Sequence, residues 1–251
     1  MRFMIQVSAA IGAILGGYLA SISFQTMLGA QIIIGWLPFF ISLTLKEPKI
    51  ERMDQKSHLK NFKKNDLIKL TVINWVVWSH ATYFAIWMLQ KYWEQLGFTI
   101  FYFGILWAIF QISAATFTKL AIVIESKLGA ITCLYLIAFS PVLGYFCMYF
   151  FTDRWAVVFG LLFALSRGLT QVILIDAINS RVPDKMRASV NSLNSFILRI
   201  TFIGVGPLVG FIFDHFGLQN VSLGLGIVFC LLTFTLVPNI SKTIYIKKKA
   251  T

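Results

Sequence analysis

Hydrophobic residues occupy long uninterrupted runs along most of this chain, and short polar segments separate them. Apolar windows cover about residues 4–21, 24–45, 70–90, 98–124, 128–151, 155–178, 190–213 and 218–238. As a helix, each window is long enough to cross the roughly 30 Å hydrocarbon core of a bilayer, in some cases with tilt. The pattern therefore predicts an all-α integral membrane protein with about 8 transmembrane helices.

The composition supports this prediction. The chain has 251 residues, of which 58% are hydrophobic, 16% aromatic and only 13% charged. A soluble fold would have to bury several runs of about 20 apolar residues in one small core, so we exclude that class. Three cysteines, Cys133, Cys147 and Cys230, lie inside apolar runs without CxxC or His–Cys spacing, and we expect neither a disulfide framework nor a metal site.

The basic residues are concentrated in alternate connections between the windows. The N-terminus, residues 46–69, 119–128 and 181–187, and the C-terminal tail hold 18 Lys and Arg, whereas the opposite connections hold only Lys91 and Arg154. Such an excess marks cytoplasmic loops, so the formal net charge of +12 reflects topology and does not indicate a nucleic-acid partner. We expect a protein of the cytoplasmic (inner) membrane with both termini in the cytoplasm and the lipid bilayer as its partner.

An internal repeat relates the first and seventh windows. Gly12-Ala13-Ile14-Leu15-Gly16-Gly17 matches Gly206-Pro207-Leu208-Val209-Gly210-Phe211 at an offset of 194 residues, and Gln25 and Gln219 open the following windows at the same offset. The first two spans therefore look like counterparts of the last two, as in a chain built from two related halves. A full first half would hold about 130 more residues and four more spans.

This arrangement resembles the major facilitator superfamily, in which twelve helices form six plus six, a long basic cytoplasmic loop joins the halves, and a GPxxGG-like element lies in the fifth and eleventh helices. The segment Glu125-Ser126-Lys127-Leu128-Gly129 is similar to the turn between helices eight and nine. The helix ten to eleven region of drug-efflux-like members is similar to Arg167-Gly168-Leu169, Asn179, Val182-Pro183 and Arg187-Ala188-Ser189. On this resemblance the chain is an N-terminally truncated member that corresponds to helices five to twelve.

The resemblance implies a major facilitator-like helical bundle with two helices from the N-terminal half and a complete six-helix C-terminal half. The expected organisation is a remnant of the N-terminal half at 1–45, a basic cytoplasmic linker at 46–69, the six-helix half at 70–240 and a basic cytoplasmic tail at 241–251. The implied function is secondary transport of a small organic solute by alternating access, with efflux as the direction and impaired activity in a truncated chain.

Two other function classes remain open, a non-transporting membrane scaffold or interaction protein and a membrane enzyme. No nucleophile triad, metal cluster or phosphate loop has convincing spacing in the sequence, so we predict no enzymatic activity and no cofactor.

Two basic residues lie deep inside predicted spans. Arg167 and Arg199 are about 12 and 9 residues from the starts of their windows, which is roughly 14–18 Å along a helix. An unpaired charge at that depth is costly, so each should face a cavity or a partner. For Arg167, with Gln171 one turn later, an anionic substrate group, a lipid headgroup and a structural hydrogen-bond network all remain open.

The third span carries an aromatic and amide pattern at Asn74, Trp78 and Tyr83, and Gln111 lies in the middle of the next. The resemblance implies that the third span lines a central cavity for an amphipathic organic substrate. Membership of an interfacial aromatic belt is the alternative, and it suits Trp75 better than Trp78. The substrate-cavity candidates are Asn74, Trp78, Tyr83, Gln111, Arg167, Gln171 and Arg199.

Small residues form a predicted helix-packing motif, whose members are Gly12, Gly16, Gly17, Gly206, Pro207 and Gly210. They place a smooth stripe on a helix face, which lets a neighbouring helix approach closely. Plain packing and a sliding surface between moving helices both remain open. For a coupling partner, a proton or another ion, the ionisable candidates are Asp176 and His80.

Overall fold

The protein is an all-α bundle of the membrane type, as the sequence predicts. A computed structural model describes residues 2–46 and 66–249, and every regular element in these two ranges is a helix. Five helices come first, α1 (Arg2–Ile22), α2 (Phe24–Ser42), α4 (Asp66–Gln95), α5 (Ile100–Leu128) and α6 (Ala130–Phe150). A broken helix follows, with η1 (Arg154–Phe159), α7 (Gly160–Leu169), η2 (Thr170–Leu174) and α8 (Ile175–Asn179), and α9 (Asp184–Lys249) is the last described helix.

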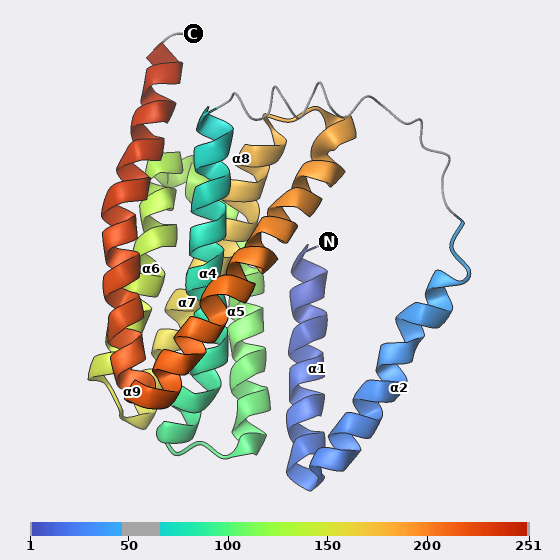
Figure 1. The fold of residues 1–251 in the computed structure, drawn as a ribbon. Helices are drawn as coiled ribbons and strands as arrows, with labels where there is room; N and C mark the ends of the chain where they lie inside the picture. Colours follow the sequence, from blue (N-terminus) through green and yellow to red (C-terminus); the bar gives the residue numbers. More distant parts are fainter. Residues whose placement is uncertain (1, 47–65, 250–251) are drawn as a thin grey trace.

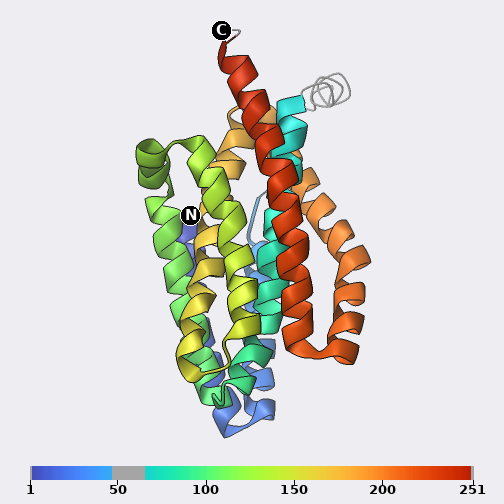
Figure 2. The ribbon, with the colours of Figure 1, turned by 90° about the vertical axis from the view of Figure 1, so that its left-hand side faces the viewer.

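Six stretches of the described ranges are long and apolar enough to cross a membrane, namely Phe3–Ile22, Phe24–Ser42, Ile100–Leu128, Ala130–Phe150, Arg154–Asn179 and Asp184–Ile244. The last of these holds two helices, because the chain reverses at Gly217, and Figure 2 shows the two parts of α9 as a hairpin. With 30 residues, α4 is also long enough to span, but it is not among the six. If the last stretch is counted as two helices and α4 is added, the described ranges hold eight candidate membrane-spanning helices. These helices lie at the positions of the eight predicted windows.

Glycine makes three of the reversals possible. Gly97 lies between α4 and α5, Gly129 between α5 and α6, and Gly217 inside α9, with φ angles of 80°, 81° and 75°. This left-handed region is costly for residues with a Cβ atom, so glycine is the residue that ends a helix in this way.

Successive helices run in opposite directions, so the connections gather at two ends (Figure 1). The start of α4, the turn between α5 and α6, the turn between α8 and α9, and the end of α9 lie at one end, which carries Lys127, Arg181 and Arg187. The turns after α4 and α6 lie at the other end, where Lys91 and Arg154 lie. These five basic residues are thus divided between the two ends as the loop count predicts.

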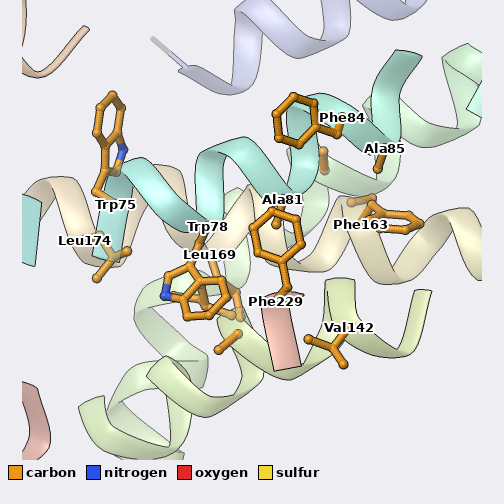
Figure 3. Packing of buried hydrophobic residues seen from close by; sticks show 14 of the residues in the cluster. Trp75, Trp78, Ala81, Phe84, Ala85, Val142, Phe163, Leu169, Leu174 and Phe229 are labelled. Carbon is orange, nitrogen blue, oxygen red and sulfur yellow. The ribbon is translucent and has the colours of Figure 1, made fainter. Parts of the chain in front are cut away.

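The core lies where α4, α6, the broken helix and α9 meet. Trp78, Tyr145 and Phe163 are fully buried there, and Figure 3 shows Trp78 beside Leu169 and Phe229. Two hydrogen bonds cross between helices in this core. The Tyr145 hydroxyl donates to the Ala81 carbonyl oxygen at 2.6 Å, and the Ser166 hydroxyl donates to the Ile137 carbonyl oxygen at 2.8 Å. These bonds satisfy hydroxyls that would otherwise be costly in an apolar surrounding.

The first two helices lie at the edge of this bundle (Figure 1). α1 packs along α5, and α2 contacts α1 while burying none of its own residues. Exposed apolar side chains such as Ile33 on α2 suit a lipid surrounding.

Two of the predicted segment boundaries differ from the helix bounds. α4 begins at Asp66, inside the predicted linker at 46–69, and residues 47–65 of that linker lie outside the described residues. α9 continues to Lys249, past the predicted start of the tail at 241. An apolar window predicts only the part of a helix that crosses the membrane. The helix itself extends beyond this part for as long as its backbone hydrogen bonds continue.

Candidate solute-binding cavity

A cavity of about 110 Å³ lies between α4, the broken helix and the first part of α9. Its lining combines one guanidinium, one amide and four hydroxyl groups with three larger apolar side chains. The lining residues are Trp75, Ser79, Thr82, Tyr83, Arg167, Thr170, Gln171, Ile175 and Leu198. A small concave site with a few converging polar groups on an apolar background is typical of a binding site for a small amphipathic molecule.

One face of α4 supplies nearly half of this lining. Trp75, Ser79, Thr82 and Tyr83 follow one another at intervals of four, three and one residues, which keeps them on one side of a helix. Trp75 therefore faces the cavity, whereas its place in the sequence favoured the interfacial belt for it.

Trp78 points to the other side of α4, into the core (Figure 3). Its side chain is fully buried, its ring centroid lies 6.4 Å from that of Phe229, and its Nε1 donates a hydrogen bond to Asn74 Oδ1 at 3.0 Å. The Asn74 amide nitrogen in turn donates to the Leu70 carbonyl oxygen at 2.9 Å. Asn74 and Trp78 are thus partners of each other in the core and do not line the cavity.

The broken helix brings Arg167 and Gln171 to the cavity. Its back is packed tightly against α5, since a Cβ atom on Gly168 would lie 2.6 Å from Phe117 Cβ and 2.8 Å from the Ala114 carbonyl oxygen. Two residues after Gly168, the helix widens into the π-helical turn η2, which begins at Thr170. π-helical turns are rare and frequently occur at functional sites, so this irregularity marks the same place as the cavity.

Arg167 has no protein partner in the part of the chain that the structure describes. Its Nε atom is buried and makes no hydrogen bond there, and none of the three ion pairs found in the two described ranges includes it. The buried hydroxyl of Thr170, which also lines the cavity, likewise makes no hydrogen bond within those ranges. Arg167 as a whole is only half-buried and lines the cavity, so its guanidinium has no described protein partner that competes with a molecule in the cavity.

Gln111 and Arg199 lie elsewhere. Gln111 is buried on α5, where its Oε1 accepts no hydrogen bond from the described residues. Arg199 is exposed, and its neighbour Leu198 lines the cavity in its place. Of the seven predicted cavity residues, the structure brings together Tyr83, Arg167 and Gln171.

Sequence reasoning missed six lining residues: Trp75, Ser79, Thr82, Thr170, Ile175 and Leu198. The spacing of Trp75, Ser79 and Thr82 is a signal that could have found the α4 face. No comparable signal exists for Thr170, because its direction depends on the π-helical turn.

The two candidates for ion coupling do not line the cavity. His80 Nδ1 lies 2.8 Å from the Val76 carbonyl oxygen, so Nδ1 carries a proton, and Nε2 lies 3.3 Å from Thr201 Oγ1 on α9. His80 thus connects α4 with the first part of α9. Asp176 is exposed on α8. The coupling partner stays a prediction.

The helix-packing glycines differ in their surroundings. A Cβ atom on Gly17 would lie 2.8 Å from Gly104 Cα, which shows that α1 and α5 approach each other closely at this point. At Gly12, Gly16 and Gly210, a Cβ atom would have no described neighbour within 4 Å, and Pro207 is exposed. At Gly206 it would meet Phe202 of the same helix at 3.3 Å.

The family model described as Major Facilitator Superfamily matches residues 1–205 of the chain. The match covers well over half of the sequence and includes every residue of the cavity. The chain belongs to the Major Facilitator Superfamily. This confirms the predicted family, and with it a transmembrane helical bundle of a family that transports small solutes. No curated protein matches the chain.

Proposed function

We propose that this major facilitator protein moves a small organic solute across the cytoplasmic membrane by alternating access, and that the cavity around Tyr83, Arg167 and Gln171 binds the solute. The observation that carries the proposal is the convergence of six polar side chains, including Arg167 without a described partner, on one cavity between the helices. Polar and ionisable groups within a membrane are costly, and they mark substrate and ion pathways.

The depth of the cavity supports this role. Arg167 lies 12 residues from the start and 11 from the end of the window at 155–178, so it is roughly 16–18 Å from either end of the span. Transporters bind their solutes near the midplane of the bilayer, where either side of the site can be closed in turn.

The surroundings of the cavity also support the proposed six-helix unit. All lining residues come from α4, the broken helix and α9, and α1 and α2 contribute none. We propose residues 70–240 as the unit that holds this part of the site. The end with Lys127, Arg181 and Arg187 is the proposed cytoplasmic end, because the cytoplasmic loops of membrane proteins carry an excess of Lys and Arg. Efflux is the proposed direction, on the likeness of the Arg167–Ser189 region to drug-efflux-like members.

Alternating access can be tested without knowledge of the solute. The three cysteines are first replaced, as Cys133→Ala, Cys147→Ala and Cys230→Ala. Single cysteines are then introduced at the cavity as Ser79→Cys, at one end as Ser126→Cys and at the other as Asp153→Cys. A membrane-impermeant maleimide is applied to right-side-out and to inverted membrane vesicles, and labelling of each variant is measured.

The proposal predicts that Ser79→Cys is labelled from both sides, since the cavity opens to each side in turn. Ser126→Cys should be labelled only from the cytoplasmic side and Asp153→Cys only from the opposite side, because both residues are exposed at the ends of helices. Labelling of Ser79→Cys from one side alone, or from neither, contradicts alternating access and favours a protein without a transport cycle.

A further inference from the structure

The charge on Arg167 is not compensated by any described acidic residue. The carboxylates of the described ranges lie at helix ends or in connections: Asp66, Glu94, Glu125, Asp153, Asp176, Asp184 and Asp214. Three of them form ion pairs with Lys69, Lys91 and Arg187, and none lines the cavity. The cavity therefore has a positive charge without a negative one on the protein that surrounds it.

The other polar groups of the lining can also donate hydrogen bonds. Gln171 has an amide NH₂, and Thr170 has a buried hydroxyl with no partner in the described chain. The Thr82 hydroxyl, in contrast, already donates to the Ser79 carbonyl oxygen at 3.0 Å. A guanidinium with neighbouring N–H and O–H donors matches a carboxylate, which accepts two parallel bonds from the arginine fork.

The remaining lining defines the rest of the ligand. Trp75, Ile175 and Leu198 give the same cavity an apolar surface beside the cation. A ligand that fills a volume of about 110 Å³ and satisfies both surfaces is small, carries one anionic group and has an apolar body.

We propose that the cavity recognises a small organic monoanion, whose carboxylate binds Arg167 and whose apolar body lies against Trp75, Ile175 and Leu198. This inference rests on the proposed transport function and specifies the substrate class of the same site. A charge in a low-dielectric surrounding interacts strongly with an opposite charge, so the anionic group dominates selection.

Two other partners of Arg167 fit the structure less well. A lipid headgroup would have to leave the interface for the middle of the bilayer, roughly 16–18 Å along the helix from either end. A structural network would use the Arg167 Nε atom, which makes no hydrogen bond in the described ranges.

Binding of three aromatic probes tests the inference. Benzoate, benzamide and benzylamine share one ring and differ in charge, from −1 through 0 to +1. Equilibrium binding of each labelled probe is measured to the purified full chain in phosphatidylcholine nanodiscs. The expected result is saturable benzoate binding, at least tenfold tighter than the binding of benzamide or benzylamine.

Matched variants assign the preference to one residue. Arg167→Gln should lose the benzoate preference, and Arg167→Lys should keep part of it, because an ammonium retains the charge but lacks the fork. Arg199→Gln, which removes the other basic residue inside a predicted span, should bind benzoate like the wild type. Thermal unfolding in detergent identifies variants that have lost the fold, and Arg167→Lys keeps the test decisive if Arg167→Gln is one of them.

Several results would overturn the inference. One is equal affinity of the wild type for the three probes, and another is the absence of saturable benzoate binding by the wild type. A third is an Arg167→Gln variant that prefers benzoate as strongly as the wild type. The last is an Arg167→Lys variant whose preference for benzoate is as strong as that of Arg199→Gln and the wild type. If phosphatidylglycerol is included in the nanodiscs and competes with benzoate at a stoichiometry of one lipid per protein, Arg167 binds a lipid headgroup. Labelling of Ser79→Cys from both sides does not depend on the anion, so it separates failure of this inference from failure of the transport proposal.

Discussion

Arg167 and Arg199 are the same residue type at similar depths in their predicted spans, and their side chains lie in different surroundings. Arg167 lines the cavity, whereas Arg199 is exposed and its neighbour Leu198 takes the place at the cavity. Successive residues on a helix point about 100° apart, so a shift of one position decides between cavity and surface. The depth of a charge in a span can be found in the sequence, but its direction depends on how the helix is rotated against its neighbours.

Asn74 and Trp78 illustrate the structural use of polar groups in the same helix. Their hydrogen bond of 3.0 Å is buried in the core, away from the cavity. Asn74→Leu leaves the Trp78 N–H without its acceptor, which should lower the free energy of unfolding by about 1–3 kcal/mol. Thermal unfolding in detergent measures this loss, and the affinity for benzoate should stay at the wild-type value.

A double-mutant cycle with Trp78→Phe isolates the bond itself. Hydrogen bonds between side chains in membrane bundles are worth roughly 0.6 kcal/mol on average and at most about 1.7 kcal/mol. The coupling between Asn74→Leu and Trp78→Phe should fall in this range. A coupling of zero, or a loss of benzoate binding in a variant that stays folded, would show that the pair does not have this structural role.

At the scale of elements, two helices of the bundle are irregular. α7 and α8 are joined through the π-helical turn η2, which lies beside the cavity, and α9 is divided by Gly217. The apolar windows at 190–213 and 218–238 predicted the division, since a short interruption separates them. The π-helical turn has no such signal, because every residue of Thr170–Leu174 is compatible with an ordinary α-helix.

The close approach of α1 and α5 gives a prediction at this scale. A side chain at position 17 would collide with the backbone of Gly104, so Gly17→Leu should separate the two helices and destabilise the protein by about 1–3 kcal/mol. Gly12→Leu is the matched control, because a Cβ atom there would have no described neighbour within 4 Å. Thermal unfolding in detergent compares the two variants.

The contradicting result would be equal thermal stability of Gly17→Leu and Gly12→Leu. In that case the α1–α5 contact would contribute little to the fold, and the packing motif would have no structural effect at Gly17, where a Cβ atom would meet the backbone of α5.

At the scale of the whole molecule, the sequence predicts more of the fold than of the site. Long apolar runs determine the number and places of the helices, and charge in alternate connections matches the two ends of the bundle (Figure 1). Tyr83, Arg167 and Gln171 were found because polar groups are conspicuous in apolar spans. Trp78 was predicted to line the cavity and Trp75 was not, because the sequence gives their spacing but not which side of α4 faces the core.

The cavity joins three elements that are far apart in the chain, α4, the broken helix and α9. A polar site between three membrane helices suits a transporter better than a scaffold, because partner binding does not require a polar site between spans. The proposed function requires that a solute moves through this cavity.

Counterflow in proteoliposomes tests this claim most directly, with labelled benzoate, benzamide and benzylamine as solutes. Vesicles with the wild-type chain should accumulate at least one of them saturably and faster than protein-free vesicles. Ser79→Trp fills the cavity and should abolish this uptake, whereas Ser195→Trp, at an exposed position of α9, should leave it unchanged. If no solute moves, or if Ser79→Trp transports at the wild-type rate, the cavity is not the solute pathway.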